Sequence, residues 1–110
     1  MDVSIRDVAT IKVVGLEGDL DTNTAPDAEQ HLNQTIADGA TKILLNLEKL
    51  EYTSSAGLRV LLSTAKKLKA AAGSLRICCL NETVEEVFEI SGFDTILDVF
   101  ATEAEALAGF

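Results

Sequence analysis

The sequence predicts an α/β domain: a mixed, mainly parallel β-sheet with an N-terminal β-hairpin and about four helices packed on it. Three observations support this fold class. Apolar and polar residues alternate near the N-terminus, two short apolar runs later in the chain are typical of buried strands, and stretches with helical spacing separate them. Such alternation of strands and helices favours a parallel sheet covered by helices. The length of 110 residues suits one domain spanning residues 1–110.

The first two strands are predicted from apolar residues at positions 3, 5, 9, 11 and 13, which alternate with polar neighbours. This pattern indicates a hairpin that turns at Arg6–Val8. The segment from Gly15 to Asp19 contains two glycines and is predicted to be a loop.

The first helix is predicted to begin near Thr24, because Thr22, Asn23 or Thr24 can cap it and Pro26 fits a first turn. Gly39 is a suitable C-terminal stop. The apolar run 42–47 then predicts a buried strand, and residues 48–52 are expected to connect it to the next helix.

The second helix is predicted to start near Ser54 or Ser55 and to stop at Gly73. Its apolar residues fall on one stripe, which predicts the face turned to the core. The stripe consists of Leu58, Leu61, Leu62, Ala65, Leu68 and Ala72.

The last third of the chain predicts a buried strand at 75–80, a helix capped by Asn81 or Thr83 that runs to Ile90, a strand at 96–100 and a helix at 101–107. Thr102 is a candidate cap for the terminal helix. The apolar stripe of the helix that ends at Ile90 is predicted to contain Val84, Val87, Phe88 and Ile90.

The net charge of −9 argues against binding to nucleic acid or to an anionic membrane, because both require clustered Lys and Arg. It suits a partner with a basic patch, or it only keeps the protein soluble. There is no basic segment followed by an apolar leader and no apolar run long enough to span a bilayer, so we expect a cytoplasmic protein. The adjacent Cys78 and Cys79 are expected to be small core residues rather than a redox or metal pair.

No motif points to an enzyme. The phosphate-binding loops G-x-x-x-x-G-K-[ST] and G-x-G-x-x-G and the nucleophile motif G-x-S-x-G are all absent. The one histidine, His31, is predicted to be a surface residue of the first helix. We therefore expect no catalytic residues, no metal and no cofactor.

The segment 52–62 is unusual because Thr53, Ser54 and Ser55 follow one another at the junction of a strand and a helix. On the residues alone, helix capping is the favoured explanation. The alternative is a regulatory site, because the N–H groups and dipole at a helix N-terminus accommodate phosphate. A phosphate there adds about −1.5 to −2 charges and would repel a partner without a large conformational change. Glu48, Glu51, Asp19 and Asp21 are expected nearby, because loops at one edge of a sheet cluster.

Three stretches together resemble the STAS domain, and specifically the anti-sigma factor antagonists. Residues 53–58 resemble the family's Asp-Ser-Ser/Ala/Thr-Gly-Leu segment, residues 18–26 its loop and helix start, and residues 80–97 its late helix and Gly-Leu/Phe-Asp turn. The resemblance covers nearly the whole chain. One departure is that Ser54 stands where the family usually has aspartate, which removes a charge and offers a second hydroxyl group.

The resemblance implies that Ser55 is phosphorylated, with Ser54 as second choice and Thr53 as third. It also implies partner switching. The unphosphorylated protein would bind an anti-sigma factor that is also an ATP-dependent serine kinase of histidine-kinase-like fold, and so release the sigma factor. Phosphorylation would end this binding, and a PP2C-type phosphatase that requires manganese or magnesium would reverse it. The implied partner contacts are Asp19, Asp21, Thr22, Asn23, Thr53, Ser54, Ala56, Gly57, Leu58 and Arg59; for Thr22 and Asn23 simple helix capping remains equally open.

Two alternatives remain at this stage. STAS domains also resemble scaffold units of stress-sensing complexes and regulatory domains of anion transporters, and the lack of a membrane-spanning run leaves the scaffold. A parallel sheet also commonly forms a ligand crevice at its strand ends, which leaves a nucleotide-binding module, although no phosphate-binding loop supports it. The sequence does not identify the sigma factor or the downstream output.

Overall fold

The computed structural model describes residues 1–110 as a six-stranded sheet with helices on both faces. The strand order is β1-β2-β3-β5-β6, and β4 pairs with the far end of β2. Only β1 and β2 are antiparallel, so the predicted mixed, mainly parallel sheet with an N-terminal hairpin is confirmed. In chain order the elements are β1 (Asp2–Val8), β2 (Ile11–Leu20), α1 (Ala25–Ala37), β3 (Lys42–Asn46), β4 (Leu50–Thr53), α2 (Ser55–Ala70), β5 (Ser74–Cys78), α3 (Glu82–Ser91), the 3-10 turn η1 (Phe93–Thr95), β6 (Asp98–Phe100) and α4 (Glu103–Leu107).

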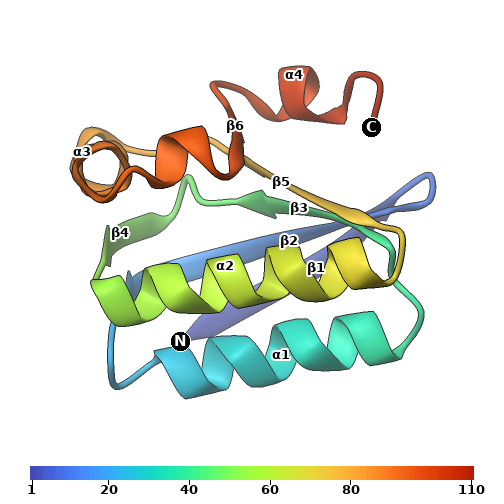
Figure 1. Ribbon diagram of the computed structural model, residues 1–110, viewed down its shortest axis with the longest axis horizontal. Coiled ribbons are helices and arrows are strands. Elements are labelled where there is room, and N and C mark those ends of the chain that lie inside the picture. The colour runs from blue at the N-terminus through green and yellow to red at the C-terminus, as the bar shows by residue number, and fades with distance from the viewer.

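The main core lies between the sheet and helices α1, α2 and α3. Figure 1 shows α1 and α2 side by side below the sheet, with α3 at one end and α4 above. Twenty buried residues form this core, and the predicted stripe of α2 supplies Leu58, Leu61 and Leu68 to it. Their separations of three and seven residues place them on one helical face.

The opposite face of the sheet has a much smaller apolar cluster of five residues, which α4 and the C-terminal residue cover. Cys78 is buried in this cluster, and the Arg76 guanidinium lies 5.1 Å from the Phe100 ring centre and 4.6 Å from the Phe110 ring centre. The cation–π contact with Phe110 therefore holds the end of the chain against β5, and the contact with Phe100 joins β5 to β6.

The structure differs from the prediction at several strands. The hairpin turns at Ala9 and Thr10, not at Arg6–Val8, and Ala9 has a φ of 54°. Residues 15–19 are not a loop but the second half of β2, because Gly15 pairs with Ser4 on one side and with Asn46 on the other. Residues 50–53, expected within a connection, form β4, which pairs with Gly18–Leu20 of β2 with a register shift between Gly18 and Asp19.

Strand and helix ends also move by a few residues. β5 ends at Cys78 rather than at residue 80, β6 begins at Asp98 after the 3-10 turn, and α4 begins at Glu103. Ala72 lies beyond the end of α2 and is exposed.

The predicted stripe of α3 is wrong at Ile90, whose residue surface is 79% exposed. Val84 and Phe88, four residues apart, face the core. Ile90 follows Phe88 by only two residues and therefore points to the other side of the helix.

Candidate functional site

The first turn of α2 gives its three hydroxyl residues three different environments. Thr53 is completely buried at the end of β4. Ser54 is half-buried and caps the helix, because its Oγ accepts a hydrogen bond from the Gly57 amide at 3.4 Å. Ser55 is the first helical residue and is exposed. Its hydroxyl group is thus the one most accessible to another protein.

Gly57 lets α2 approach β2 closely. A Cβ atom at this position would lie 2.5 Å from the Leu20 carbonyl oxygen and 2.5 Å from the Thr53 Oγ1 atom. The Ser54 amide donates to the same Leu20 carbonyl at 2.9 Å. The glycine, which weakens the helix by about 1 kcal/mol relative to alanine, is therefore required for this contact.

The turn between β2 and α1 is organised by Asp21. Its Oδ1 atom accepts hydrogen bonds from the Asn23 amide at 2.9 Å and the Thr24 amide at 3.2 Å. Thr24 is the cap residue of α1, but its hydroxyl group donates to the Asp19 carbonyl at 2.7 Å instead of capping the helix. The side chains of Thr22 and Asn23 are exposed and form no hydrogen bond within the protein, so they stay free at the surface.

The two segments predicted as partner contacts lie side by side. Asp19 is in register with Tyr52, and Leu20 with Thr53, so the end of β2 and the start of α2 form one end of the molecule, at the left of Figure 1. Leu20 joins them through its backbone carbonyl, a role that no side-chain pattern could reveal. We call the exposed residues of this end the switch surface; they are Asp19, Asp21, Thr22, Asn23, Ser54, Ser55, Ala56 and Arg59, of which Asp21, Ser54 and Ala56 are half-buried.

Three of the residues predicted to contact a partner lie beneath this surface. Thr53, Gly57 and Leu58 are buried, with Leu58 only 1% exposed. Their side chains pack in the fold and support the exposed residues from below. In this structure the three side chains are therefore not exposed for contact with another protein.

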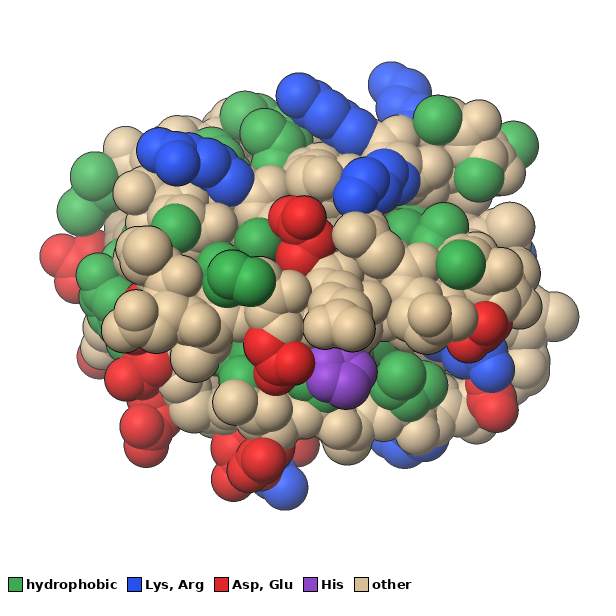
Figure 2. Space-filling view, turned by 90° about the horizontal axis from the view of Figure 1, so that it is seen from below, with side chains coloured by type: hydrophobic (Ala, Val, Ile, Leu, Met, Phe, Trp, Pro, Cys, Tyr) green, Lys and Arg blue, Asp and Glu red, His purple; other side chains and the backbone are tan.

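Acidic side chains gather at the end of the molecule where α1 and α2 begin. Figure 2, which views the molecule from the side of these helices, shows Asp and Glu toward the left end and Lys and Arg mainly along the upper border. The first turn of α2 itself contains no acidic residue, unlike the first turns of α1, α3 and α4. The positive end of the α2 dipole is therefore not offset by a carboxylate of its own helix.

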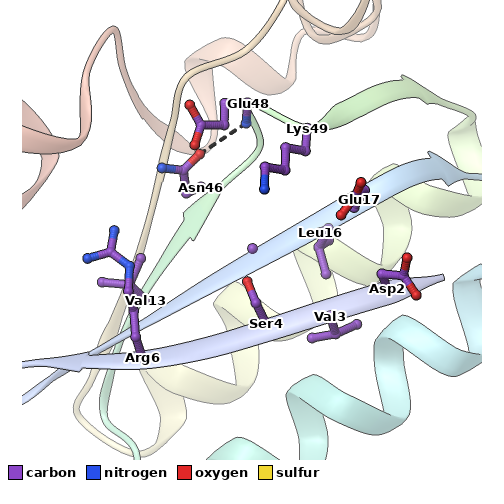
Figure 3. A pocket seen from close by; sticks show the side chains of 11 residues that line it. Asp2, Val3, Ser4, Arg6, Val13, Leu16, Glu17, Asn46, Glu48 and Lys49 are labelled. Carbon is purple, nitrogen blue, oxygen red and sulfur yellow. Dashed lines mark hydrogen bonds between the residues drawn. The ribbon is translucent and has the colours of Figure 1, made fainter.

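A separate groove of about 280 Å³ lies across β1, β2 and the β3–β4 turn, and it shares no residue with the switch surface. Figure 3 shows that Glu48, expected near Ser55, points into this groove, where its amide donates to Asn46. At one end of the groove Arg6 contacts Glu103 of α4. This hydrogen bond, and next the one from Asn46, lower the pKa of Glu103.

The remaining candidate groups form no reactive centre. No three or more His, Cys, Asp or Glu side chains gather as a metal site would require. His31 is on the surface, as predicted, and its Nε2 atom lies 3.6 Å from the Asp27 Oδ1 atom. Cys78 and Cys79 are free thiols, and burial, followed by the Cys79 side chain, raises the pKa of Cys78. None of the helices combines the length and apolar composition needed to cross a membrane.

The family model described as the STAS domain matches residues 2–106. The chain belongs to the STAS domain family. Among curated relatives, BtrV of Bordetella bronchiseptica, provisionally named an anti-sigma factor antagonist, is 36% identical over 110 residues, which cover all of this chain and 95% of that protein. The anti-sigma-B factor antagonist of Staphylococcus aureus is 33% identical over 86 residues, covering 78% of this chain and 80% of its own.

Solved structures of the anti-sigma factor antagonist SpoIIAA have the same STAS fold. The unphosphorylated form is 27% identical and the phosphorylated form, from Bacillus, is 29% identical. Both match 96% of this chain with a TM-score of 0.72, and the matches cover 94% and 96% of the SpoIIAA chains. This agreement confirms the predicted fold and family.

Proposed function

We propose that this STAS protein is an anti-sigma factor antagonist that works by partner switching, with Ser55 as the phosphorylated residue. The observation that carries the proposal is the exposure of Ser55. Of the three neighbouring hydroxyl residues it alone is exposed, and it lies at the first position of a helix, on the switch surface. The half-buried Ser54 is second, because its Oγ is already bonded to Gly57, and the buried Thr53 is third.

A phosphate on Ser55 would meet free backbone amides at the start of α2, where no acidic side chain competes. It would not need to disturb the fold. The equal similarity of this chain to the phosphorylated and unphosphorylated forms of SpoIIAA supports a switch without refolding.

The effect on a partner is electrostatic. In the unphosphorylated state the switch surface binds an anti-sigma factor, as the names of the relatives suggest. The phosphate would add about −1.5 to −2 charges to an end that is already acidic, and would displace contacts that had excluded water. The proposed partner is a serine kinase that carries out this phosphorylation with ATP, and a PP2C-type phosphatase restores the binding form.

The test is to incubate the purified protein with the serine kinases of its own organism that have a histidine-kinase-like fold, and to locate phosphate by mass spectrometry. We expect one phosphate on Ser55 and loss of kinase binding. Ser55→Ala should bind the kinase normally and accept no phosphate, whereas Ser54→Ala and the distant control Ser91→Ala should be phosphorylated like the parent.

Binding measurements test the charge-repulsion mechanism separately from the identity of the phosphorylated residue. Ser55→Asp should weaken kinase binding, by less than phosphate does because it adds one charge. If the kinase binds the phosphorylated protein as tightly as the parent, charge repulsion is wrong. If no kinase modifies the folded protein, a constitutive scaffold role replaces the switch.

A further inference from the structure

Strand β1 is a long, open edge of the sheet. All seven of its residues pair in continuous register with β2 on one side, and no strand lies on the other. Natural edge strands are usually short or protected by proline, by charged side chains or by a bulge. β1 is long and has no proline and no bulge, and its charged residues Asp2, Arg6 and Asp7 include both signs. The opposite edge, β6, has three residues, and β4 has four and lies against α3. β1 is therefore the edge most able to add another strand.

The backbone of β1 alternates between groups that face β2 and groups that face away. In an antiparallel pair every second residue is hydrogen-bonded to its opposite. A two-residue turn makes Val8 and Ile11 the first such pair, so the alternation leaves the amides and carbonyls of Val3, Ile5 and Asp7 directed outward.

We propose that two copies of this chain pair antiparallel through β1, with the two-fold axis passing Ser4. In this register Ser4 lies opposite Ser4 of the second copy. Val3 lies opposite Ile5 of the second copy, and Asp2 lies opposite Arg6 of the second copy. The two-fold axis makes each of these pairs occur twice. The outward backbone groups of Val3 and Ile5 meet, so the register also satisfies the backbone.

The side chains fit this register better than one with the two-fold axis at Ile5. Val3 pairs with Ile5 on one face, which covers an isoleucine that is 49% exposed. On the other face the exposed Asp2 and Arg6 form opposite-charge pairs. An axis at Ile5 would instead place Asp7 opposite Val3 and Asp2 opposite Val8. Arg6 can keep its contact with Glu103, because a guanidinium has five N–H donors.

Charge also favours this edge over the rest of the surface. The chain has a net charge of −9, so two copies repel each other over most approaches. Within residues 1–12, by contrast, Asp2 and Asp7 are balanced by Arg6 and Lys12. The Lys12 ammonium also contacts Asp7 directly. Residues 1–12, which include all of β1, thus have balanced side-chain charges in an acidic protein.

Pairing would also extend the groove. Asp2, Ser4 and Arg6 of β1 line the groove, and Figure 3 shows Ser4 and Arg6 on the same side of the strand. A second copy would bring its own Asp2, Ser4 and Arg6 to the same rim, and so join two grooves across the two-fold axis.

A cross-link tests the register. Residues opposite each other in a non-hydrogen-bonded pair have Cα atoms about 4.5 Å apart, within the range of a disulfide. In a Cys79→Ser background we expect Ser4→Cys to form a disulfide-linked dimer on mild oxidation. The matched control Ile5→Cys should form no disulfide cross-link, because its opposite residue is Val3. A cross-link through Ile5→Cys and not through Ser4→Cys would overturn the proposal.

Charge reversal tests the same pairing without cysteine. By sedimentation equilibrium, Asp2→Arg or Arg6→Asp alone should weaken dimerisation about tenfold, since each replaces two attractive pairs by two repulsive ones. The double variant should restore it. Glu103→Gln, which removes the other partner of Arg6, and Asp98→Arg on the far edge should leave it unchanged. A monomer at millimolar concentration, or a double variant as weak as the single ones, would overturn the proposal. Phosphorylation of Ser55 does not enter this test, so the proposed function can fail separately.

Discussion

The first turns of α2 and α3 share one plan but differ in what completes them. Both begin with a capping side chain that accepts a hydrogen bond from the third helical residue, at 3.4 Å from Gly57 in α2 and 2.8 Å from Val84 in α3. In α3 the cap Asn81 also donates to the Leu50 carbonyl at 2.9 Å. Its first turn carries two glutamates, whereas the first turn of α2 carries no acid.

This difference separates a structural helix start from one suited to regulation. The start of α3 contains its own negative charge and a cap tied to β4, so nothing remains for a partner or a modification to supply. The start of α2 has a weaker cap, an exposed hydroxyl group and an uncompensated dipole. A phosphate is the group that would complete it.

The largest expected effect concerns the packing of the third residue of each helix, which is Gly57 in α2 and Val84 in α3. Gly57→Ala should destabilise the protein by about 3 kcal/mol, because its Cβ would clash with the backbone of β2. Val84→Ala at the equivalent position of α3 should cost about 2 kcal/mol, because it leaves a cavity in the core. Urea unfolding monitored by circular dichroism measures both. Full stability of Gly57→Ala would show that α2 can move away from β2.

Removing the capping side chains should cost an intermediate amount of stability, and the cost should differ between α3 and α2. Asn81→Ala should cost about 2 kcal/mol, because it removes both the cap and the bond to Leu50. Ser54→Ala should cost about 0.5 kcal/mol, because its hydrogen bond is long. The same unfolding experiment compares them, and equal losses would contradict the proposed difference between the two helix starts.

The smallest effect concerns charge at the first position. Ser55→Asp should stabilise the protein by about 0.5 kcal/mol, and Glu82→Gln in α3 should destabilise it by a similar amount. Both effects should shrink in 1 M salt. A destabilised Ser55→Asp variant would mean that the start of α2 does not accept negative charge, and phosphate would then have to act by disturbing the fold.

Features set by neighbouring residues could be predicted from the sequence. The caps Ser54, Asn81 and Thr102, the start of α2 and the exposure of His31 depend on the few residues around them. Strand β4 and the second half of β2 could not be predicted in this way. They form because they pair with strands about thirty residues away in the chain.

The candidate site divides in the same way. The helix start around Ser55 could be predicted from its hydroxyl residues, but the choice of Ser55 and of residues 19–23 came from the resemblance to STAS domains. That Thr53 and Leu58 are buried, and that the Leu20 carbonyl joins the two segments, depends on how α2 rests on β2. No local pattern carries that information.

Strand β2 pairs with β1 on one side, and on the other side it pairs with β3 as far as Gly15 and with β4 from Gly18 onward. This arrangement bears on the order of folding. The hairpin of β1 and β2 closes a two-residue turn and can form early, while pairing with β3 and β4 must close much longer loops. The far end of β2 and β4, which hold the switch surface, are then assembled late. In native-state hydrogen exchange we expect their amides to open more readily than those at the centre of the sheet, so the end of the molecule that contains the switch surface would be the first to loosen.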